Sequence, residues 1–308
     1  MRAAVIRALG GPEVFEIIER ENPTTLPTEV LIRVQAAGLN PVEALVRSGA
    51  FPLVTAPATL GWDVSGVVEE VAPGVARFVV GDEVFGMPFF PRPAQAYAEY
   101  VAAPSRQLAK KPARLSHAQA AALPLAGLTA YQSLVDIAHV RPGQRVLVHG
   151  GGGGVGHVAI QIARALGAYV VTTASAGKHE FVRSLGADEV IDYRSDDFTK
   201  RTGDIDVVLE MIGGDYGPRS IEVLRPGGLL VSTLEGANLE LAARVKKAGR
   251  RFAGVSVEPD YVGLEALAAL VEQGKLSVHV SETFPLAQVA DAHRKLGQSI
   301  QGKLVLTM

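Results

Sequence analysis

A run of glycines is the part of the sequence whose composition and spacing point most directly to chemistry. Gly150 to Gly154 are consecutive, and Gly151, Gly153 and Gly156 fit the spacing G-x-G-x-x-G. In a strand–turn–helix unit, the first of these glycines permits a tight turn and the second lets the backbone approach a pyrophosphate. The third lets the helix pack close to the sheet. Among five glycines this match also arises by chance, and the alternative is a flexible loop.

The segments around the glycines decide between these two interpretations. Arg145–His149 is a short apolar run that predicts a strand, and Val155–Leu166 carries apolar residues at helical spacing. Ala168–Thr173 predicts a second strand about twenty residues further on. Phosphates would lie at the start of the helix, against the backbone of Gly154 and Val155, where N–H groups and the helix dipole favour negative charge. This context favours a dinucleotide site.

The residues after the second strand bear on which dinucleotide binds. NAD sites usually end this strand with an acid that binds the ribose 2′-hydroxyl. Here Ser175 and Lys178 follow the strand, and the first acid is Glu180, already inside the next predicted helix. Tyr193 and Arg194, after the third strand, could add a hydroxyl and a charge. This pattern favours NADP(H), although Lys178 alone could be an ordinary solvated lysine.

The chain divides into regions with different patterns of apolar residues, glycine and proline. Residues 1–123 consist of short apolar runs broken by glycine and proline, which predicts a β-rich domain with a helix at Pro41–Arg47. From 124 to 262, strands alternate with helices, which predicts βαβ units and a doubly wound parallel sheet of the α/β class. We expect residues 263–308 to return to the first domain.

Composition excludes several classes of protein. The 30 basic and 32 acidic residues nearly cancel, so neither nucleic acid nor an anionic membrane is the expected partner. Cysteine is absent, which excludes disulfides, thiolate zinc sites and a cysteine nucleophile. The first residues lack the core of a signal peptide, and no apolar stretch approaches the roughly 18 residues of a membrane span. We therefore expect a cytoplasmic protein.

A series of short motifs, in a fixed order, carries a family resemblance. They are Ala36–Asn40, Gly61–Val68, Val80–Val84, Tyr97–Tyr100, Leu123–Tyr131, the glycine motif with Gln161 and Ala165–Ala168, Leu224–Gly228, and Gly302–Lys303. Together they resemble the medium-chain dehydrogenase/reductase superfamily, and within it the zinc-free quinone oxidoreductase (ζ-crystallin-like) group. The resemblance covers essentially the whole chain and implies a GroES-like catalytic domain followed by a Rossmann domain.

Departures from zinc-dependent members of that superfamily are informative. Those relatives place a cysteine where this chain has Asn40, a histidine where it has Trp62, and a third ligand near Leu125. The cysteine-rich lobe that holds a structural zinc is also missing. We therefore expect no metal, and chemistry that hydride transfer performs without a Lewis acid.

The resemblance also implies site residues in the catalytic domain. It places Asn40 at the nicotinamide or the substrate, whereas an asparagine before Pro41 is also a good helix N-cap. Thr129 resembles the nicotinamide-side threonine of the family, or is an ordinary hydroxyl inside a helix. Phe51 and Trp62 are candidate walls of the substrate pocket, or simply core.

Two further residues belong to this set of candidates. Asp63 could be a catalytic acid, but a structural carboxylate bonded to backbone or to an arginine is the favoured interpretation. Gly213, after the strand predicted at Asp206–Glu210, fits a loop lying close to the cofactor. The expected cofactor site therefore consists of the glycine motif, Ser175, Lys178, Tyr193 and Gly213, together with Asn40 and Thr129.

Three functions fit these observations. The leading hypothesis is an NADPH-dependent reductase that transfers hydride to a small quinone or α,β-unsaturated carbonyl. The second is a trans-enoyl-thioester reductase from a neighbouring branch of the superfamily. The third is an NADPH-binding structural or redox-sensor protein with little turnover. Relatives often dimerise through the edge of the Rossmann sheet, so we also expect a homodimer formed by the apolar strand Arg251–Val257.

Overall fold

The computed structural model describes residues 1–234, 238–296 and 298–308. They form two compact units, one made of Met1–Leu128 with Glu258–Met308 and the other of Thr129–Val257. The division after Leu128 falls within helix α3 (Pro124–Tyr131). The boundaries expected from sequence, 123/124 and 262/263, lie near these divisions.

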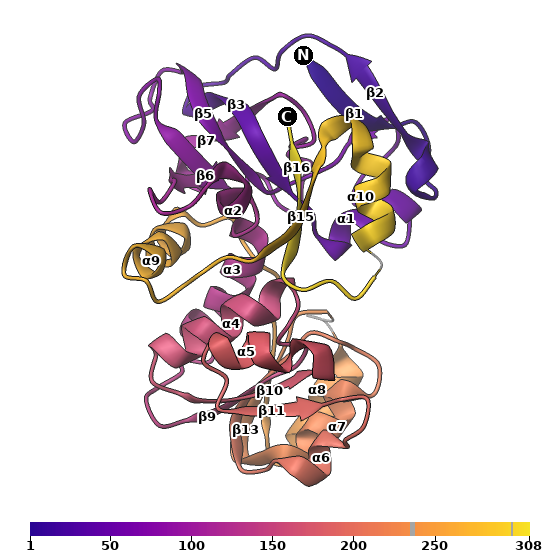
Figure 1. The fold of residues 1–308 in the computed structure, drawn as a ribbon, viewed down its shortest axis with the longest axis vertical. Coiled ribbons are helices and arrows are strands. Elements are labelled where there is room, and N and C mark those ends of the chain that lie inside the picture. Colours follow the sequence, from indigo (N-terminus) through magenta and orange to yellow (C-terminus); the bar gives the residue numbers. More distant parts are fainter. Residues whose placement is uncertain (235–237, 297) are drawn as a thin grey trace. The chain divides into compact units, whose positions relative to one another are not determined.

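The first unit is built mainly from strands (Figure 1). Its strands are β1 (Arg2–Ile6), β2 (Phe15–Glu19), β3 (Glu29–Gly38), β4 (Ala58–Thr59), β5 (Val64–Val71), β6 (Glu83–Gly86), β7 (Tyr100–Pro104), β8 (Leu108–Lys110), β15 (Val280–Pro285) and β16 (Lys303–Thr307). Its helices are α1 (Pro41–Ser48), α2 (His117–Ala121), α9 (Tyr261–Glu272) and α10 (Val289–Leu296), together with the first part of α3.

Two sheets organise these strands. A three-stranded sheet has the order β2-β1-β4, and a seven-stranded sheet has the order β15-β16-β3-β5-β6-β8, with β7 also paired to β3. The C-terminal strand β16 runs antiparallel to the end of β3, with Val305 opposite Gly38. The last strand of the chain therefore lies beside the turn that leads from β3 into α1.

The second unit is a parallel sheet with helices on both faces. Its strands are β9 (Arg145–Val148), β10 (Tyr169–Ala174), β11 (Glu189–Asp192), β12 (Ile205–Glu210), β13 (Leu224–Ser232) and β14 (Arg251–Gly254). Its helices are α4 (Gly154–Ala165), α5 (His179–Ser184), α6 (Phe198–Arg201), α7 (Tyr216–Val223) and α8 (Leu239–Lys247), with a π-helical segment at Gln132–Ile137 that continues α3.

The order of these strands identifies the fold of the second unit. The order is β11-β10-β9-β12-β13-β14, and every neighbouring pair is parallel. The edge strand β11 is the third strand of this unit along the chain. Numbered from β9, this is the order 3-2-1-4-5-6 of the dinucleotide-binding fold. The predicted doubly wound α/β architecture is confirmed. In such sheets ligands bind at the carboxyl ends of the strands, where the strand order reverses, which here is between β9 and β12.

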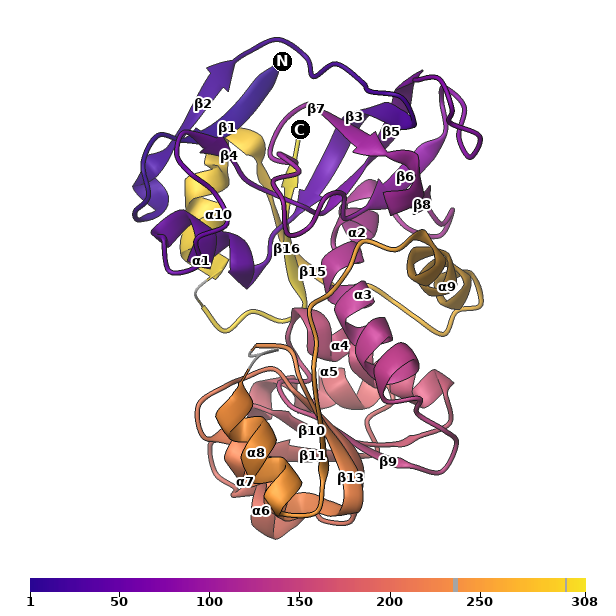
Figure 2. The same ribbon diagram turned by 180° about the vertical axis from the view of Figure 1, so that it is seen from behind.

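The sheet is buried because helices cover both of its faces. Val171, Leu147, Val208 and Leu230 lie directly opposite one another across four strands and share one face. They pack in one core cluster with residues of α6, α7 and α8, while α4 and α5 lie on the opposite face (Figures 1 and 2). This explains why β9 reads as an uninterrupted apolar run rather than an alternating one.

Two sequence-based element predictions are corrected by the structure. The strand expected at Arg251–Val257 ends at Gly254. The pattern of residues 178–185 predicts a helix that includes Lys178, but α5 begins at His179, after a 3-10 turn at Ala176–Lys178. Lys178 therefore lies in the turn before the helix. In the described part of the chain, no helix combines the length and the apolar character needed to cross a membrane.

Candidate functional site

The turn between β9 and α4 requires glycine at its first and third motif positions. A Cβ atom on Gly151 would come under 3.0 Å from the hydroxyl of Thr172, and one on Gly156 would come equally close to the carbonyl oxygen of Gly150. Neither neighbour can move away easily, because the first lies in the sheet and the second is backbone. These glycines let α4 begin directly against the turn.

Gly153 differs from these two glycines. Its backbone is extended, with φ −91° and ψ −174°, and the nearest atom to an added Cβ is the Gly150 carbonyl oxygen at 3.3 Å. A Cβ here would be tight against that oxygen, but the fold requires glycine less strictly than at Gly151 or Gly156. Gly153 is the N-cap of α4 and supplies no capping side chain, so the N–H groups of Gly154, Val155 and Gly156 begin the helix. An anion is the expected ligand of such a terminus, and it would occupy the space that a Cβ would fill.

Thr173, at the end of β10, holds the turn in place. Its hydroxyl accepts the N–H of Gly150 at 3.0 Å, and its carbonyl accepts the N–H of Gly151 at 2.9 Å. His149 lies 3.3 Å from the same hydroxyl and 3.0 Å from that of Ser220. Burial, and secondarily the charge of Arg219, lowers the pKa of His149 to about 3, so the imidazole is neutral and acts as a structural hydrogen-bonding group.

Cationic side chains gather at the carboxyl ends of β10 and β11. The side chain of Lys178 crosses the glycine turn, where a Cβ on Gly152 would lie 2.6 Å from its Cδ. Burial lowers the pKa of Lys178, and the neighbouring Arg194 lowers it further. Ser175 is buried in the same turn. The guanidinium carbon of Arg194 lies over the ring of Tyr193, 5.8 Å from its centre. Two cations close enough for one to lower the pKa of the other form a suitable site for an anion.

A buried carboxylate shapes the loop after β12, and sequence reasoning did not single it out. Glu210 accepts the N–H groups of Ile212 at 2.6 Å and Gly213 at 2.7 Å. Gly213 and Gly214 have φ values of +83° and +61°, which favour glycine. The carboxylate therefore fixes the loop in which Gly213 was expected to approach the cofactor. A signal was present, since Glu210 is an acid at the end of an otherwise apolar strand.

In the first unit, the Asn40 side chain is fixed by three neighbours. Its amide nitrogen donates to the carboxyl of Asp63 at 3.0 Å and to that of Glu43 at 3.3 Å. Its amide oxygen accepts the ammonium of Lys303. Asn40 is also the N-cap of α1, and its backbone N–H is bound by Glu43. Both amide hydrogens are thus already donated to carboxyl groups.

Asp63 and Lys303 form the charged centre of this cluster. Asp63 is fully buried, accepts the backbone N–H of Leu125 at 2.7 Å, and lies 3.5 Å from the ammonium of Lys303. The favoured interpretation of Asp63 as a carboxylate bonded to backbone agrees with this geometry, although its cation is a lysine rather than an arginine. In the sequence, Lys303 is recognisable only as part of the Gly302–Lys303 motif. Its pairing with Asp63 spans 240 residues, so no local pattern indicates it.

These neighbours do not form a zinc site. The Asn40 oxygen already binds an ammonium, and the indole N–H of Trp62 donates to the carbonyl of Arg92 at 2.7 Å. Leu125 has no side-chain donor atom. In the part of the chain that the structure describes, no group of three histidine, cysteine, aspartate or glutamate side chains is arranged to hold a metal ion.

The remaining predicted residues lie in different surroundings. Trp62 is buried, with its ring edge-on to Phe90 at 5.2 Å, whereas Phe51 is 43% exposed beyond the end of α1. Thr129 is buried in α3, and its carbonyl accepts the hydroxyl of Ser133 at 2.6 Å. The structure therefore brings Asn40 together with Asp63, Glu43 and Lys303, and the glycine turn together with Lys178.

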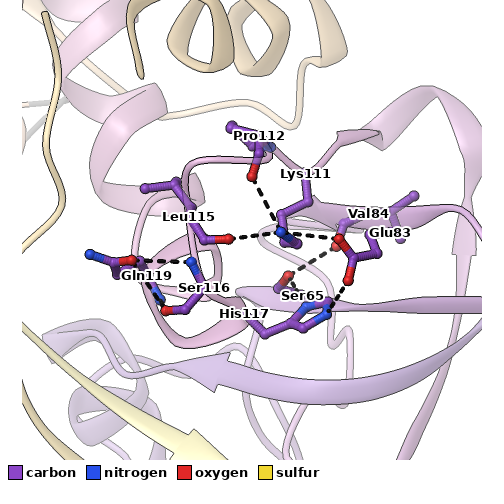
Figure 3. Close-up of polar contacts among 9 residues, drawn as sticks. All are labelled: Ser65, Glu83, Val84, Lys111, Pro112, Leu115, Ser116, His117 and Gln119. Atoms are coloured by element: carbon purple, nitrogen blue, oxygen red, sulfur yellow. Dashed lines mark hydrogen bonds and ion pairs between the residues drawn. The ribbon is translucent and has the colours of Figure 1, made fainter. Parts of the chain in front are cut away.

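A second polar cluster has the residue types of a hydrolase triad (Figure 3). The hydroxyl of Ser65 lies 2.9 Å from Nδ1 of His117, and Nε2 of His117 lies 3.1 Å from Glu83, which also pairs with Lys111. Ser65, however, is completely buried in β5 and donates to the carbonyl of Val84 at 3.1 Å. No substrate reaches this hydroxyl, and the cluster fastens α2 to the strands.

The glycine geometry yields a prediction about two similar substitutions. Gly156→Ala should destabilise the fold, because its Cβ would collide with backbone. Gly153→Ala should lose much less stability, because its Cβ would lie 3.3 Å from the same oxygen, and should lose dinucleotide affinity. Thermal unfolding and fluorescence titration with NADPH measure the two effects separately. Gly203→Ala is the matched control, since nothing lies within 4 Å of its added Cβ. Unchanged NADPH affinity in Gly153→Ala would contradict the assignment of this turn.

The buried carboxyls yield a prediction about pH. Burial, followed by the charge of Asp63, raises the pKa of Glu43 from 4.5 to about 8. Between these values the unfolded chain releases a proton that the folded protein keeps. The free energy of unfolding should therefore fall with rising pH, on the order of 1.4 kcal/mol per pH unit from this group. Denaturant titrations across this pH range give the free energy of unfolding at each pH, and this free energy should vary less with pH in Glu43→Gln than in the wild type. The exposed control Glu180→Gln should match the wild type, and parallel profiles for all three proteins would contradict the prediction.

Comparison with known proteins identifies both units. Residues 26–113 match the family model of the alcohol dehydrogenase GroES-like domain, and residues 185–306 match that of the zinc-binding dehydrogenase. The predicted GroES-like domain is thereby confirmed. Quinone oxidoreductase from Pongo abelii is 35% identical, over 100% of this chain and 98% of the relative. A spectinabilin polyketide synthase system protein from Streptomyces orinoci is 38% identical over 92% of this chain, which spans 13% of that protein.

Solved structures agree with these matches. The quinone oxidoreductase from Coxiella burnetii has a TM-score of 0.94 and 36% identity, with 100% of this chain and 99% of that chain covered. The quinone oxidoreductase from Escherichia coli, solved in complex with NADPH, has a TM-score of 0.89 and 29% identity, with both chains covered completely. The chain is an oxidoreductase that belongs to the quinone oxidoreductase group of the medium-chain dehydrogenase/reductase superfamily.

Proposed function

We propose that this protein is a zinc-independent, NADPH-dependent reductase that transfers hydride to a small quinone or α,β-unsaturated carbonyl. The observation that carries the cofactor choice is the placement of Lys178 and Arg194, which share one end of the sheet beside the glycine turn. A 2′-phosphate would lower the repulsion between these cations, whereas the neutral 2′-hydroxyl of NADH would leave it in place. Ser175 and Tyr193 are the neighbouring hydroxyls available to the same phosphate.

The comparisons support the same proposal. Quinone oxidoreductases match this chain over its full length, and the relative from Escherichia coli was solved with NADPH. The bound nicotinamide would supply the hydride, and an already electrophilic acceptor needs no metal to accept it. The protein has to orient the two reactants and exclude water.

Within this proposal, Asn40 and Thr129 contact the nicotinamide or the substrate, and Phe51 and Trp62 belong to the substrate pocket. Both amide hydrogens of Asn40 are held by carboxyls and its oxygen accepts the ammonium of Lys303, so a contact with the cofactor or substrate would use the second lone pair of that oxygen. A hydrogen bond to the acceptor oxygen that gains charge must come from another donor. Among the described residues, we propose Lys303 as that donor: it is buried beside Asn40 and already donates to Asn40 and Asp63.

A trans-enoyl-thioester reductase is the second candidate, and one observation favours it. The chain is 38% identical to part of a polyketide synthase system protein. Thioester reduction would use the same cofactor site and the same hydride transfer, and would differ in the acceptor. The two candidates are therefore separated by the acceptor that gives the higher kcat/KM.

We propose that two copies of the chain pair through β14. This strand is the edge of the parallel sheet, and Phe252, Ala253 and Gly254 are each partly exposed. An unpaired edge offers backbone groups to the same edge of a second copy. Sedimentation velocity should give twice the mass of one chain, and a monomer at micromolar concentration would contradict the pairing.

Turnover with both cofactors tests the proposed function. NADPH should reduce a quinone or a short enone with a KM well below that of NADH. In Lys178→Ala the KM for NADPH should rise about tenfold or more, with kcat little changed, because the lost interaction binds substrate and transition state alike. The control Lys200→Ala, whose side chain is 81% exposed, should behave as wild type.

Three outcomes would change the assignment. Equal use of NADH by the wild type would contradict the 2′-phosphate site at Lys178. Preference for an enoyl-thioester acceptor would favour the second candidate. Tight NADPH binding without turnover on any acceptor would instead indicate a structural or redox-sensor protein.

A further inference from the structure

A pocket in the first unit lies outside the residues discussed so far. It has a volume of about 400 Å³, within the range of small-molecule sites. Its walls come from the three-stranded sheet, from the segment before β4, and from the segment that follows the Phe90–Pro91 bond. The lining residues are Val5, Arg7, Ile18, Arg20, Val54, Thr55, Pro57, Ala58, Thr59, Pro93 and Gln95.

The register of the sheet places the floor of this pocket on one face. Val5 lies opposite Thr59 on β4, and Ala3, two residues before Val5, lies opposite Ile18 on β2. Directly opposed residues and residues two apart share a face of a sheet. Val5, Ile18 and Thr59 therefore point the same way, and Arg20 extends that face beyond the end of β2 (Figure 2 shows β2, β1 and β4 together).

Arg20 is the unusual member of this lining. Its Nη1 donates to two neutral groups, the hydroxyl of Thr59 at 3.3 Å and the amide oxygen of Gln95 at 3.0 Å. Its Nε is buried without a hydrogen-bond partner. Across the described residues, no carboxylate lies within 4.0 Å of this guanidinium. The second arginine of the pocket, Arg7, already pairs with Glu16 at 2.8 Å.

The guanidinium of Arg20 thus lies beside the pocket without a carboxylate partner among the described residues. Partial burial lowers the pKa of Arg20, the direction expected when a cation loses part of its hydration. The Arg20 side chain is partly buried, and its Nε is a buried donor without a partner, whereas buried donors in proteins are normally hydrogen-bonded. Every other lining residue is apolar or neutral, apart from Arg7. The missing counter-charge is therefore expected from a ligand rather than from the chain.

The rest of the lining limits what that ligand can be. Val5, Ile18, Val54, Pro57 and Pro93 supply hydrocarbon surface around the guanidinium. A single uncompensated arginine matches one negative charge, and its planar fork matches the two oxygens of a carboxylate. A fully hydrated ion such as free phosphate would gain nothing from the apolar walls.

We propose that this pocket binds a small organic monocarboxylate, with the carboxylate on Arg20 and the hydrocarbon body against the apolar walls. The site is separate from the proposed cofactor and Asn40 sites, so it stands whether or not the reductase function does.

Benzoate and benzamide test the proposal as a matched pair of probes. They share size and shape and differ in charge. Titration of the full-length protein, followed by ligand-observed NMR and calorimetry, should show benzoate binding at least about tenfold tighter than benzamide. Arg20→Gln should remove this difference, as expected when a charge-assisted hydrogen bond is lost. Arg7→Gln is the control and should keep it, because Arg7 is already paired with Glu16.

The remaining outcomes are equally decisive. Equal affinity for benzoate and benzamide, or benzoate binding that survives Arg20→Gln, would overturn the proposal. Inorganic phosphate that competes with benzoate at equal concentration would overturn the role of the apolar walls. If Arg20→Gln fails to fold, Thr55→Trp narrows the pocket from an exposed rim position. Benzoate binding unchanged in that variant would contradict the location.

Discussion

The close packing of α4 against the turn that precedes it is the constraint on which the second unit depends. A single Cβ at Gly156 would collide with the carbonyl oxygen of Gly150, so the helix begins where only glycine fits. That contact points the helix N-terminus at the carboxyl edge of the sheet. It also brings the turn within hydrogen-bonding reach of Thr173 and under the side chain of Lys178. The proposed phosphate site thus follows from a steric requirement of the backbone.

The first unit depends on a different kind of interaction, a buried cluster of charges. Asp63 and Lys303 are both removed from water, and each is costly to bury alone. Asn40 and the N–H of Leu125 satisfy the remaining donors and acceptors, while the raised pKa of Glu43 keeps that neighbour protonated at neutral pH. Because β16 supplies Lys303, the pairing of the last strand with β3 is what places this ammonium in the cluster.

Local features of the sequence predict local features of the structure. The strand, glycine turn and helix around Gly151 are contiguous, and so is the turn that carries Ser175 and Lys178. Their geometry is set by nearby backbone, so the glycine spacing together with the strand and helix patterns around it indicates them. The pairing of Asn40 with Lys303 spans 263 residues and depends on strand order, which no local pattern encodes. Arg20 is similar, because only the finished sheet shows that it has no carboxylate beside it. Gly153 lies between these cases: the motif includes it, and the structure shows that a Cβ there would be tight against the Gly150 carbonyl oxygen at 3.3 Å but less crowded than at Gly151 or Gly156.

The most direct test of hydride transfer compares NADPH carrying deuterium at one face of nicotinamide C4 with the other face deuterated. With a quinone or short enone as acceptor, the account predicts that one labelled form slows NADPH oxidation or delivers its deuterium to the enone, while the other behaves as unlabelled NADPH. Binding of NADPH without oxidation by any acceptor, or oxidation insensitive to either label with no deuterium transferred, would contradict it.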